Sequence, residues 1–321
     1  MIINLLIDYF YNGGDYVYAD LVCKGGGILG LALVGSITYF EEQGYVWKRL
    51  AGTSVGAVVA SLCAVGYKSQ ELHEIIEELD FKSIADKNIL QSIPFVGPVS
   101  SLFISKGIHS GDYIENFLRE KYQKKGKTTF KDISYNNKSR LKIIATDVTN
   151  QKLLTLPDDL YKYNIDPMSF DIAKAVRMSL SIPIFYNPKV LFDNNNQPCY
   201  IVDGGLLSNL PVWIFDCDKI PRWPTFGLNL INTKPVNQKK TSSLRSYLYD
   251  IIFTSLKTSE DVYFKECDAI RIVNIPTSIS STVYFDISES EKQQLYNSGY
   301  YAAKQFLSNW DFSLYKRLYR S

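Results

Sequence analysis

Residues 45–66, YVWKRLAGTSVGAVVASLCAVG, carry the clearest indication of the fold class. Its β-forming start predicts a short strand through Val46–Ala51, and its apolar second half predicts a helix that ends at Gly66. Between them, the pentapeptide GTSVG has the G-x-S-x-G spacing of a nucleophile elbow, in which glycines let a strand and a helix approach each other closely. This pattern predicts Ser54 as a nucleophile at a helix N-terminus, whereas the plainer interpretation is a tight turn that Ser54 caps.

A second unit of the same kind precedes the first one. Tyr16–Cys23 predicts a strand, which the triple glycine at 25–27 ends. The apolar spacing within Gly30–Gln43 predicts a buried helix, and Gly44 stands just beyond its end. Two adjacent strand–glycine turn–helix units indicate parallel strands. We therefore expect an α/β fold of three layers, α/β/α, around a mostly parallel central sheet.

The rest of the chain supplies further elements and one irregular segment. Residues 72–79 have the spacing of an amphipathic helix, and residues 81–111 show no sustained period, which makes them a candidate lid. Further patterns predict a strand at Leu141–Thr146, a turn at 193–198 between two strands, and a last helix from Ser288 to Phe306 that begins with a capping box. No repeat or linker divides the sequence, so we expect one domain over residues 1–321.

Composition disfavours several function classes. The 321 residues include 35 Lys+Arg and 33 Asp+Glu, a net charge of +2, which argues against a charge-driven nucleic-acid partner. The 5 cysteines include no C-x-x-C pair, so we expect isolated buried thiols in a reducing compartment, with no metal and no cofactor. The first residues lack the basic start and cleavage site of a signal peptide, and no apolar run is long enough to span a bilayer. We expect a cytoplasmic protein whose membrane contact is at most peripheral.

The two histidines are poorly placed for a Ser-His-Asp triad. His73 lies among glutamates on the polar side of the predicted amphipathic helix, which favours an exposed position. His109 belongs to a predicted turn before a helix that starts near Asp112, and no histidine follows it. On α/β-hydrolase folds the histidine comes after the acid, so a histidine-dependent triad is disfavoured and His109 stays only formally available. The base must then be a carboxylate.

Asp203 is the carboxylate best placed for that role. It ends the apolar strand segment YIV at 200–202, and Gly204 and Gly205 open the backbone beside it. An exposed aspartate is a weak base, but burial against a closed pocket would raise its pKa toward the operating pH. Taken alone, D-G-G is more often a turn than an active site. Its weight comes from its occurrence together with the Ser54 turn.

The triple glycine Gly25-Gly26-Gly27 is a candidate oxyanion hole. It follows the first predicted strand and opens the first helix, so several backbone N–H groups can converge at a positive helix end. The alternative is a dinucleotide phosphate loop, because Gly25, Gly27 and Gly30 satisfy G-x-G-x-x-G. Against this alternative, the second helix begins with a nucleophile elbow, and no acidic residue ends the strand at Val46–Ala51.

These three elements, in this order, resemble the patatin-like phospholipase family: a triple-glycine loop, a G-x-S-x-G elbow and a distant D-G-G. The similarity covers roughly residues 16–215, with 216–321 as a C-terminal extension. The segments that carry it are LAGTSVGA at 50–57, ATDVT at 145–149, AVRMSLSIP at 175–183 and DGGLLSNLP at 203–211.

The resemblance implies a Ser54–Asp203 dyad, in which Asp203 deprotonates Ser54 and later activates the water that hydrolyses the acyl-enzyme. It implies an oxyanion hole at Gly25–Gly27, an elbow framed by Gly52 and Gly56, and no metal. A phospholipid or another acyl-ester lipid is the implied substrate. We therefore expect an activity of the phospholipase A or lysophospholipase type.

One position departs from the family's usual pattern, G-G-G-x-[RK]-G. Leu29 stands where the pattern has a cation, while Lys24 lies just before the glycines. Loss of one electrostatic donor to the oxyanion costs on the order of 3 kcal/mol in barrier, roughly a hundredfold in rate. Leu29 and the aromatic-basic tail at 315–320 keep open the alternative of a catalytically weak or idle lipid- or partner-binding protein. The tail itself is predicted to be an exposed helix end.

Overall fold

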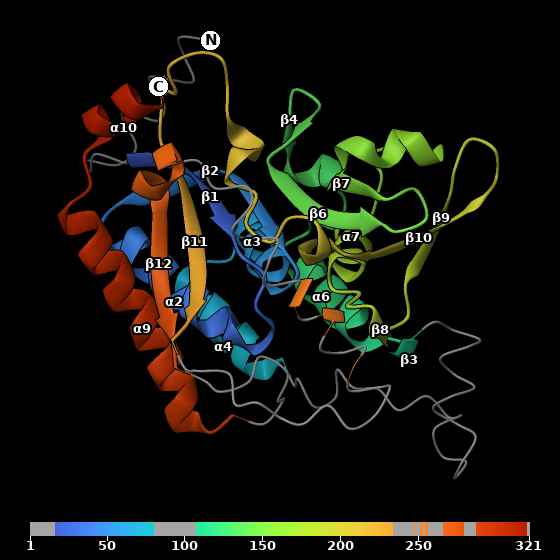
Figure 1. Cartoon of the computed structure of the whole chain (residues 1–321), viewed down its shortest axis with the longest axis horizontal. Helices are drawn as coiled ribbons and strands as arrows, with labels where there is room; N and C mark the ends of the chain where they lie inside the picture. Colours follow the sequence, from blue (N-terminus) through green and yellow to red (C-terminus); the bar gives the residue numbers. More distant parts are fainter. Residues whose placement is uncertain are drawn as a thin grey trace.

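The computed structural model describes residues 17–79, 107–233, 247, 251–252, 254–255, 266–278 and 287–319. Most of the candidate lid at 81–111 therefore lies outside the described residues. A mixed sheet runs through the centre of the described part, and the long helices pack against it (Figure 1). The predicted α/β class with a mostly parallel sheet is confirmed.

The central sheet pairs its strands in the order β12-β11-β1-β2-β6-β10-β9, and β7 also pairs with β6. Parallel pairing joins five of them: β12 (Ile272–Thr277), β11 (Thr225–Asn232), β1 (Val17–Cys23), β2 (Tyr45–Thr53) and β6 (Leu141–Asp147). Antiparallel pairing adds β7 (Lys152–Leu156), β10 (Pro198–Asp203) and β9 (Lys189–Phe192). Two small pairs lie outside this sheet, β3 (Gly107–His109) with β8 (Ile184–Tyr186) and β4 (Ser134–Tyr135) with β5 (Lys138–Ser139).

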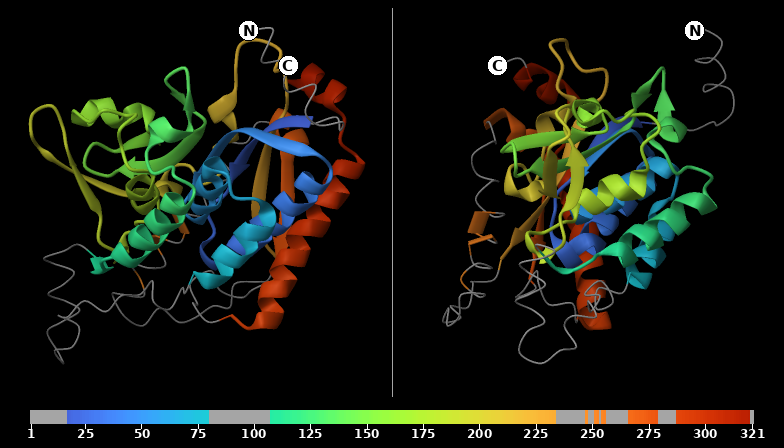
Figure 2. Two further views of the ribbon diagram at one scale, coloured as in Figure 1. Left: turned by 180° about the vertical axis from the view of Figure 1, so that it is seen from behind. Right: turned by 90° about the vertical axis from the view of Figure 1, so that its right-hand side faces the viewer.

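The helices lie mainly on one face of the sheet. Figure 2 (left) shows from behind that α2, α4 and the long α9 stand in front of the strands. The α-helices are α2 (Gly30–Glu42), α3 (Val55–Val65), α4 (Ser69–Glu78), α6 (Asp112–Lys124), α7 (Ile172–Ser179), α9 (Glu289–Ser308) and α10 (Phe312–Leu318). Short 3-10 segments are η1 (Gly27–Leu29), η3 (Phe130–Ile133), η4 (Asp158–Tyr163), η5 (Gly204–Leu206), η6 (Val212–Phe215) and η7 (Glu266–Arg271).

The two strand–turn–helix units have the boundaries that the sequence predicts within one or two residues. β1 leads through the triple glycine to α2, and β2 leads through Ser54 to α3. Both helices end at glycines in the left-handed region, with φ of 79° at Gly44 and 110° at Gly66. Because β1 and β2 are parallel neighbours, both glycine turns follow the carboxyl ends of their strands and lie at the same end of the sheet.

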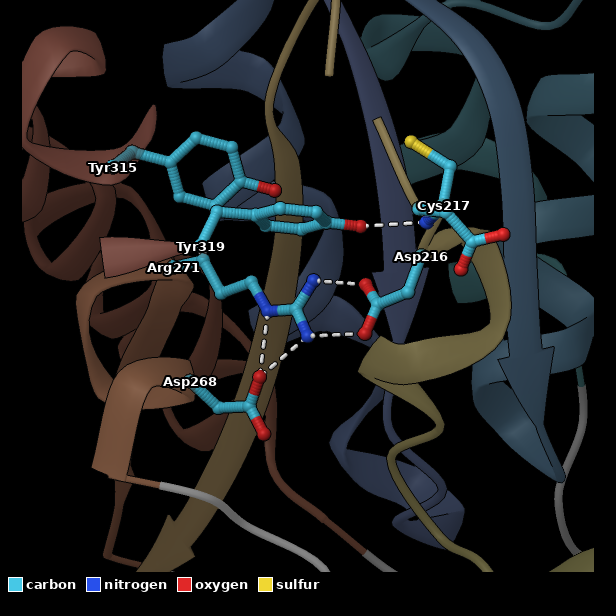
Figure 3. Close-up of a pocket in the computed structure, with 7 residues that line it drawn as sticks. Asp216, Cys217, Asp268, Arg271, Tyr315 and Tyr319 are labelled. Atoms are coloured by element: carbon cyan, nitrogen blue, oxygen red, sulfur yellow. Dashed lines mark hydrogen bonds and ion pairs between the residues drawn. The ribbon is translucent and has the colours of Figure 1, made fainter. Parts of the chain in front are cut away.

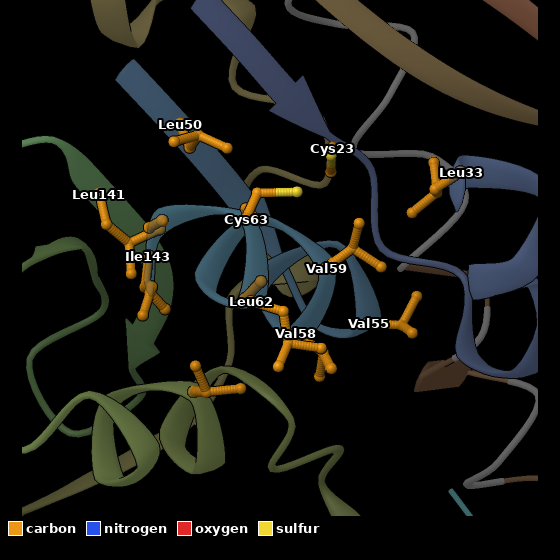
Figure 4. Packing of buried hydrophobic residues seen from close by; sticks show 14 of the residues in the cluster. Cys23, Leu33, Leu50, Val55, Val58, Val59, Leu62, Cys63, Leu141 and Ile143 are labelled. Atoms are coloured by element: carbon orange, nitrogen blue, oxygen red, sulfur yellow. The ribbon is translucent and has the colours of Figure 1, made fainter. Parts of the chain in front are cut away.

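Helix α3 forms the centre of the core. All of its residues are buried, and Figure 4 shows Leu33 of α2 on one side of it and Ile143 of β6 on the other. Burial of one Val or Leu side chain contributes about 1.5–3 kcal/mol. The helix that begins at the Ser54 turn is therefore fixed by several such side chains, among them Val55, Val58, Val59 and Leu62.

Two glycines let α2 and α9 cross in direct contact. A Cβ at Gly35 would lie 2.0 Å from the carbonyl oxygen of Tyr296, and one at Gly299 would lie 1.8 Å from that of Ala32. The Ser36 hydroxyl donates to the Gly299 carbonyl at 2.7 Å. This crossing attaches the C-terminal extension to the helix that follows the triple glycine.

The opposite face of the sheet has a smaller core. In the described ranges it is covered by the segment around η6 rather than by a long helix, with Val22, Ala51, Leu210, Val212, Phe215 and Ile272 buried together. No helix among the described residues is both long and apolar enough to cross a bilayer.

Three details of the sequence prediction were wrong. The capping box at Ser288 starts α9 as expected, but α10 follows it, and Tyr315 in the predicted exposed tail is only 1% exposed. Tyr315 is buried because α10 folds back so that its ring packs against Trp310. Cys217 is exposed, whereas the other thiols described are buried and free, Cys23, Cys63 and Cys199. The backbone of His109 belongs to β3 rather than to a turn, because it pairs with β8.

Candidate active site

Ser54 occupies the junction between β2 and α3, where the sequence pattern places it. Its φ of 53° and ψ of −127° lie in a region that residues with a Cβ rarely adopt, at a cost on the order of 1–3 kcal/mol. The Ser54 carbonyl accepts hydrogen bonds from the N–H groups of Ala57 and Val58, at 2.8 and 3.3 Å, so the helix starts immediately. Such a turn presents the serine hydroxyl at a helix N-terminus, as a nucleophile elbow does.

The glycines that frame the turn leave no room for a side chain. A Cβ at Gly52 would lie 2.2 Å from the Gly56 carbonyl oxygen, and a Cβ at Gly56 would lie 2.2 Å from that of Cys23. Both contacts are with backbone atoms, which cannot move aside as a flexible side chain can. The close approach of strand and helix that the G-x-S-x-G spacing predicts is therefore present.

Asp203 reaches the Ser54 turn because two strands share one edge of β6. β2 pairs with β6 up to Thr53 opposite Ile144, and β10 pairs with β6 from Asp203 opposite Ala145. β7 pairs with the same stretch of β6, and a strand has only two edges, so β2 and β10 lie on the other edge. Their carboxyl ends meet head to head, which brings Asp203 next to the Ser54 turn.

The backbone turns sharply away after Asp203. A Cβ at Gly204 would lie 2.3 Å from the Ile144 carbonyl oxygen, so only glycine fits at this position. The next residue, Gly205, donates its N–H to Asp203 Oδ1 at 2.7 Å. The two glycines that follow Asp203 thus have separate structural roles.

The carboxyl group of Asp203 is held in an environment that disfavours its charge. Asp203 is 1% exposed, and among the described residues its Oδ2 has no hydrogen-bond partner. Burial raises the pKa of Asp203 from 3.8 to about 7, against the opposing effects of the Gly205 N–H and the Ser54 hydroxyl. A carboxylate with a pKa near neutrality is suited to accept and return a proton.

The triple glycine lies beside the Ser54 turn. A Cβ at Gly25 would lie 3.1 Å from Ser54 Cβ and 2.3 Å from Asn209 Oδ1. The Gly25 N–H donates to the Asn209 carbonyl at 3.2 Å. In the described part of the chain, the N–H groups of Gly26 and Gly27 have no protein acceptor. Two of the three N–H groups can therefore bind an oxyanion without losing an existing hydrogen bond.

Leu29 has no charge to offer the glycine loop, and the described contacts of Lys24 are with β11. Leu29 is buried in the core. The Lys24 ammonium group donates to Asn229 Oδ1 at 2.8 Å and to the Leu230 carbonyl at 2.7 Å, so it is held at the end of β11.

His73 is not placed to act as a base for Ser54. His73 Nδ1 lies 3.6 Å from a carboxylate oxygen of Glu77, and its ring packs edge-on against Tyr296. This half-exposed position on α4 agrees with the predicted surface role. The side chain of His109 lies outside what the structure describes.

Sequence reasoning gave no role to Ser179, although its side chain contacts Ser54 directly. Its hydroxyl accepts the Ser54 N–H at 2.9 Å and donates to the Ile144 carbonyl at 2.6 Å. Asn209 was missed in the same way, and its carbonyl and side chain border Gly25. Both residues stand in segments that resemble the family, AVRMSLSIP and DGGLLSNLP, which was the only available signal.

A polar cavity of about 250 Å³ lies apart from this site, near the amino ends of β11 and β12 (Figure 3). Arg271 at its centre is buried and donates to Asp216 at 2.6 and 3.2 Å, and also to Asp268. The Tyr319 hydroxyl accepts the Cys217 N–H at 2.7 Å. These contacts attach α10 and η7 to the loop after η6, which gives the cluster a structural role.

Among the described residues, no group of three or more His, Cys, Asp or Glu side chains is arranged to hold a metal ion.

Comparison with known proteins identifies the family. The model of the family described as patatin-like phospholipase matches residues 21–216. The chain is 33% identical over 301 residues to the uncharacterized protein YqhO of Bacillus subtilis (strain 168). This alignment covers 92% of this chain and 100% of YqhO. The chain therefore belongs to the patatin-like phospholipase family, and its general activity is that of a lipid hydrolase.

Two more distant similarities agree with this assignment. The chain is 25% identical over 219 residues to the cUMP-AMP-activated phospholipase of Escherichia coli, across 65% of this chain and 60% of that protein. The crystal structure of VipD from Legionella pneumophila matches with a TM-score of 0.55 at 16% identity, across 92% of this chain and 67% of VipD. At that identity the likeness to VipD shows the fold alone.

Proposed function

We propose that the protein is a lipid acyl hydrolase of the phospholipase A or lysophospholipase type, with Ser54 as the nucleophile and Asp203 as its base. One observation carries the proposal, the buried Asp203 carboxyl group with an unpartnered Oδ2 and a pKa of about 7 beside the strained Ser54 turn. A buried charge without a partner destabilises a fold. A role in proton transfer to and from Ser54 explains why a carboxyl group occupies this buried position.

In the acylation step, Asp203 Oδ2 takes the proton of the Ser54 hydroxyl as Ser54 Oγ attacks the ester carbonyl carbon. The carbonyl oxygen becomes an oxyanion, which the N–H groups of Gly26 and Gly27 stabilise. The Gly25 N–H, already bonded to Asn209, holds the loop in shape. The tetrahedral intermediate then expels the alcohol, which receives the proton from Asp203, and the acyl group remains on Ser54.

Deacylation uses the same groups in the second half of the cycle. Asp203 removes a proton from a water molecule, and the resulting hydroxide attacks the acyl-enzyme carbonyl. The same N–H groups stabilise the second oxyanion. Collapse of this intermediate releases the fatty acid, and the proton returns from Asp203 to Ser54 Oγ.

Membership of the family supports a phospholipid or another acyl-ester lipid as the substrate. The similarity to the cUMP-AMP-activated phospholipase supports the narrower choice of a phospholipid ester. Because such substrates reside in membranes or micelles, we propose peripheral contact with a lipid surface during turnover.

The direct test is release of fatty acid from labelled phospholipid and lysophospholipid micelles, combined with fluorophosphonate labelling of the serine. We expect activity in the wild type, and a loss of at least about a hundredfold in Ser54→Ala and in Asp203→Asn. Ser61→Ala, which alters a buried serine further along α3, is the control and should stay active. Full activity in either dyad variant would overturn the mechanism.

A catalytically weak or idle lipid-binding protein is the second candidate, and Leu29 is the observation that favours it. Leu29 supplies no cation where the family's usual pattern has one, which removes one electrostatic donor to the oxyanion. Mass spectrometry of the fluorophosphonate adduct separates the two candidates. Labelling of Ser54 supports the enzyme, and binding of lipid vesicles without labelling supports the idle protein.

A further inference from the structure

One short segment at the end of α7 holds the main chains of both dyad residues. The Ser179 hydroxyl accepts the Ser54 N–H at 2.9 Å, and the Ser181 carbonyl accepts the Asp203 N–H at 2.9 Å. Both serines are 0% exposed. The three consecutive residues 179–181 therefore contact the main chains of both Ser54 and Asp203, and they fix the two residues relative to each other.

The Ser179 contact also connects Ser54 to the strand on which Asp203 is aligned. A hydroxyl has one proton, which Ser179 donates to the Ile144 carbonyl at 2.6 Å, so a lone pair remains for the Ser54 N–H. The same Ile144 carbonyl lies under Gly204, the residue directly after Asp203. The Ile144 carbonyl thus contacts both Ser179, which holds Ser54, and Gly204, which follows Asp203.

A buried arginine fastens the segment from behind. Arg177 is 1% exposed, and its guanidinium donates to the Ser181 hydroxyl and to the Asn187 carbonyl, the latter at 3.0 Å. It also donates to the Ser110 carbonyl. In the described part of the chain Arg177 forms no ion pair, so these neutral acceptors define its position.

We propose that Ser179 is a positioning residue for the nucleophile, which holds the Ser54 main chain in its left-handed conformation and in register with Asp203. This inference rests on the proposed function of Ser54. Ser54 cannot relax to an ordinary backbone conformation without breaking the Ser179 hydrogen bond and leaving a buried N–H unpaired. A displacement of about 1 Å of a reacting group lowers a rate by roughly a hundredfold.

The test compares Ser179→Ala with Ser61→Ala in the full chain. Ser61 is a matched control because it is also 0% exposed and also makes two hydrogen bonds, with the Val58 carbonyl and the Tyr122 hydroxyl. We expect similar losses of thermal stability in the two variants. The rate constant of fluorophosphonate labelling at Ser54 should fall about ten- to a hundredfold in Ser179→Ala and stay within about twofold of wild type in Ser61→Ala.

The pH dependence of labelling adds a readout that a purely structural role would not give. Ser179 does not contact the Asp203 carboxyl group, so the midpoint of the pH profile should stay in place while the plateau falls. If Ser179→Ala does not fold, Ser179→Cys replaces the hydroxyl by a weakly bonding thiol of similar size, and its labelling rate must fall as well. Labelling of either folded variant at the wild-type rate overturns the role of Ser179. A wild-type protein whose Ser54 is never labelled instead overturns the proposed function.

Discussion

Asp203→Asn separates the cost of a buried charge from its use in catalysis. Asparagine has nearly the same shape as aspartate, and its Oδ1 can still accept the Gly205 N–H, which lies 2.7 Å from Asp203 Oδ1. It carries no charge at any pH. The variant therefore keeps the packing of the site and removes only its titration.

The magnitude follows from the pKa of Asp203, which burial raises from 3.8 to about 7. Between these values the folded protein binds one more proton than the unfolded chain, so the stability of the wild type falls as the pH rises through this window. At about 1.4 kcal/mol for each pH unit, the whole window corresponds to about 4 kcal/mol. The Asp203→Asn variant lacks this contribution to the pH dependence of the unfolding free energy, because asparagine does not titrate.

Urea unfolding at a series of pH values measures the difference in unfolding free energy between variant and wild type. We expect this difference to grow in favour of Asp203→Asn by about 3 kcal/mol from about pH 4.5 to about pH 8. The amide Nδ2 replaces the unpartnered Oδ2, and an unpaired amide costs about 1–3 kcal/mol at every pH, which shifts the curve but keeps its slope. A difference that stays constant within about 1 kcal/mol over this pH range would show that burial does not raise the pKa of Asp203.

Three other predictions use separate features of the structure. The rate of Ser54 labelling should rise with pH and level off above about pH 7, because Asp203 accepts a proton only when ionised. A time course of labelling at several pH values measures this, and a flat profile would exclude Asp203 as the base. Gly52→Ala should cost more than about 3 kcal/mol of stability, since its Cβ would lie 2.2 Å from the Gly56 carbonyl oxygen. Denaturant titration checks it, and a variant as stable as wild type would contradict the close packing of the elbow. Arg271→Met should cost about 3–5 kcal/mol by leaving the buried Asp268 and its neighbour Asp216 without their cation. Ser54 labelling of the folded Arg271→Met protein should be unchanged, and a slower rate would indicate that the cluster is coupled to the active site.

Local patterns predicted the elements around Ser54 well, because they depend on interactions within a few residues. The glycine spacing, the strand composition and the helix period act within 45–66, and β2, the turn and α3 follow them. The same holds for the capping box at Ser288, where side chain and backbone are neighbours in the chain. The tail after α9 was predicted less well, because Tyr315 of α10 is buried by packing that no local pattern contains.

The side chains and backbone groups that contact Ser54 and the triple glycine could not be predicted in the same way. Ser179 lies at the end of a different helix, and only the fold places its hydroxyl between Ser54 and Ile144. Lys24 stands next to the triple glycine in sequence, yet its ammonium group is held by β11. Which neighbour a polar side chain contacts is decided by the tertiary packing rather than by its position in the chain.

The order of residues along the chain was enough to predict a serine in a glycine-framed turn between a strand and a helix, and to select Asp203 as the candidate carboxylate. The tertiary structure alone decided that Asp203 lies beside Ser54 and that its pKa is raised. The physical reason is that strand pairing joins distant segments: β2 and β10 meet only because both pair with one edge of β6. Burial of the carboxyl group is likewise a property of the assembled core.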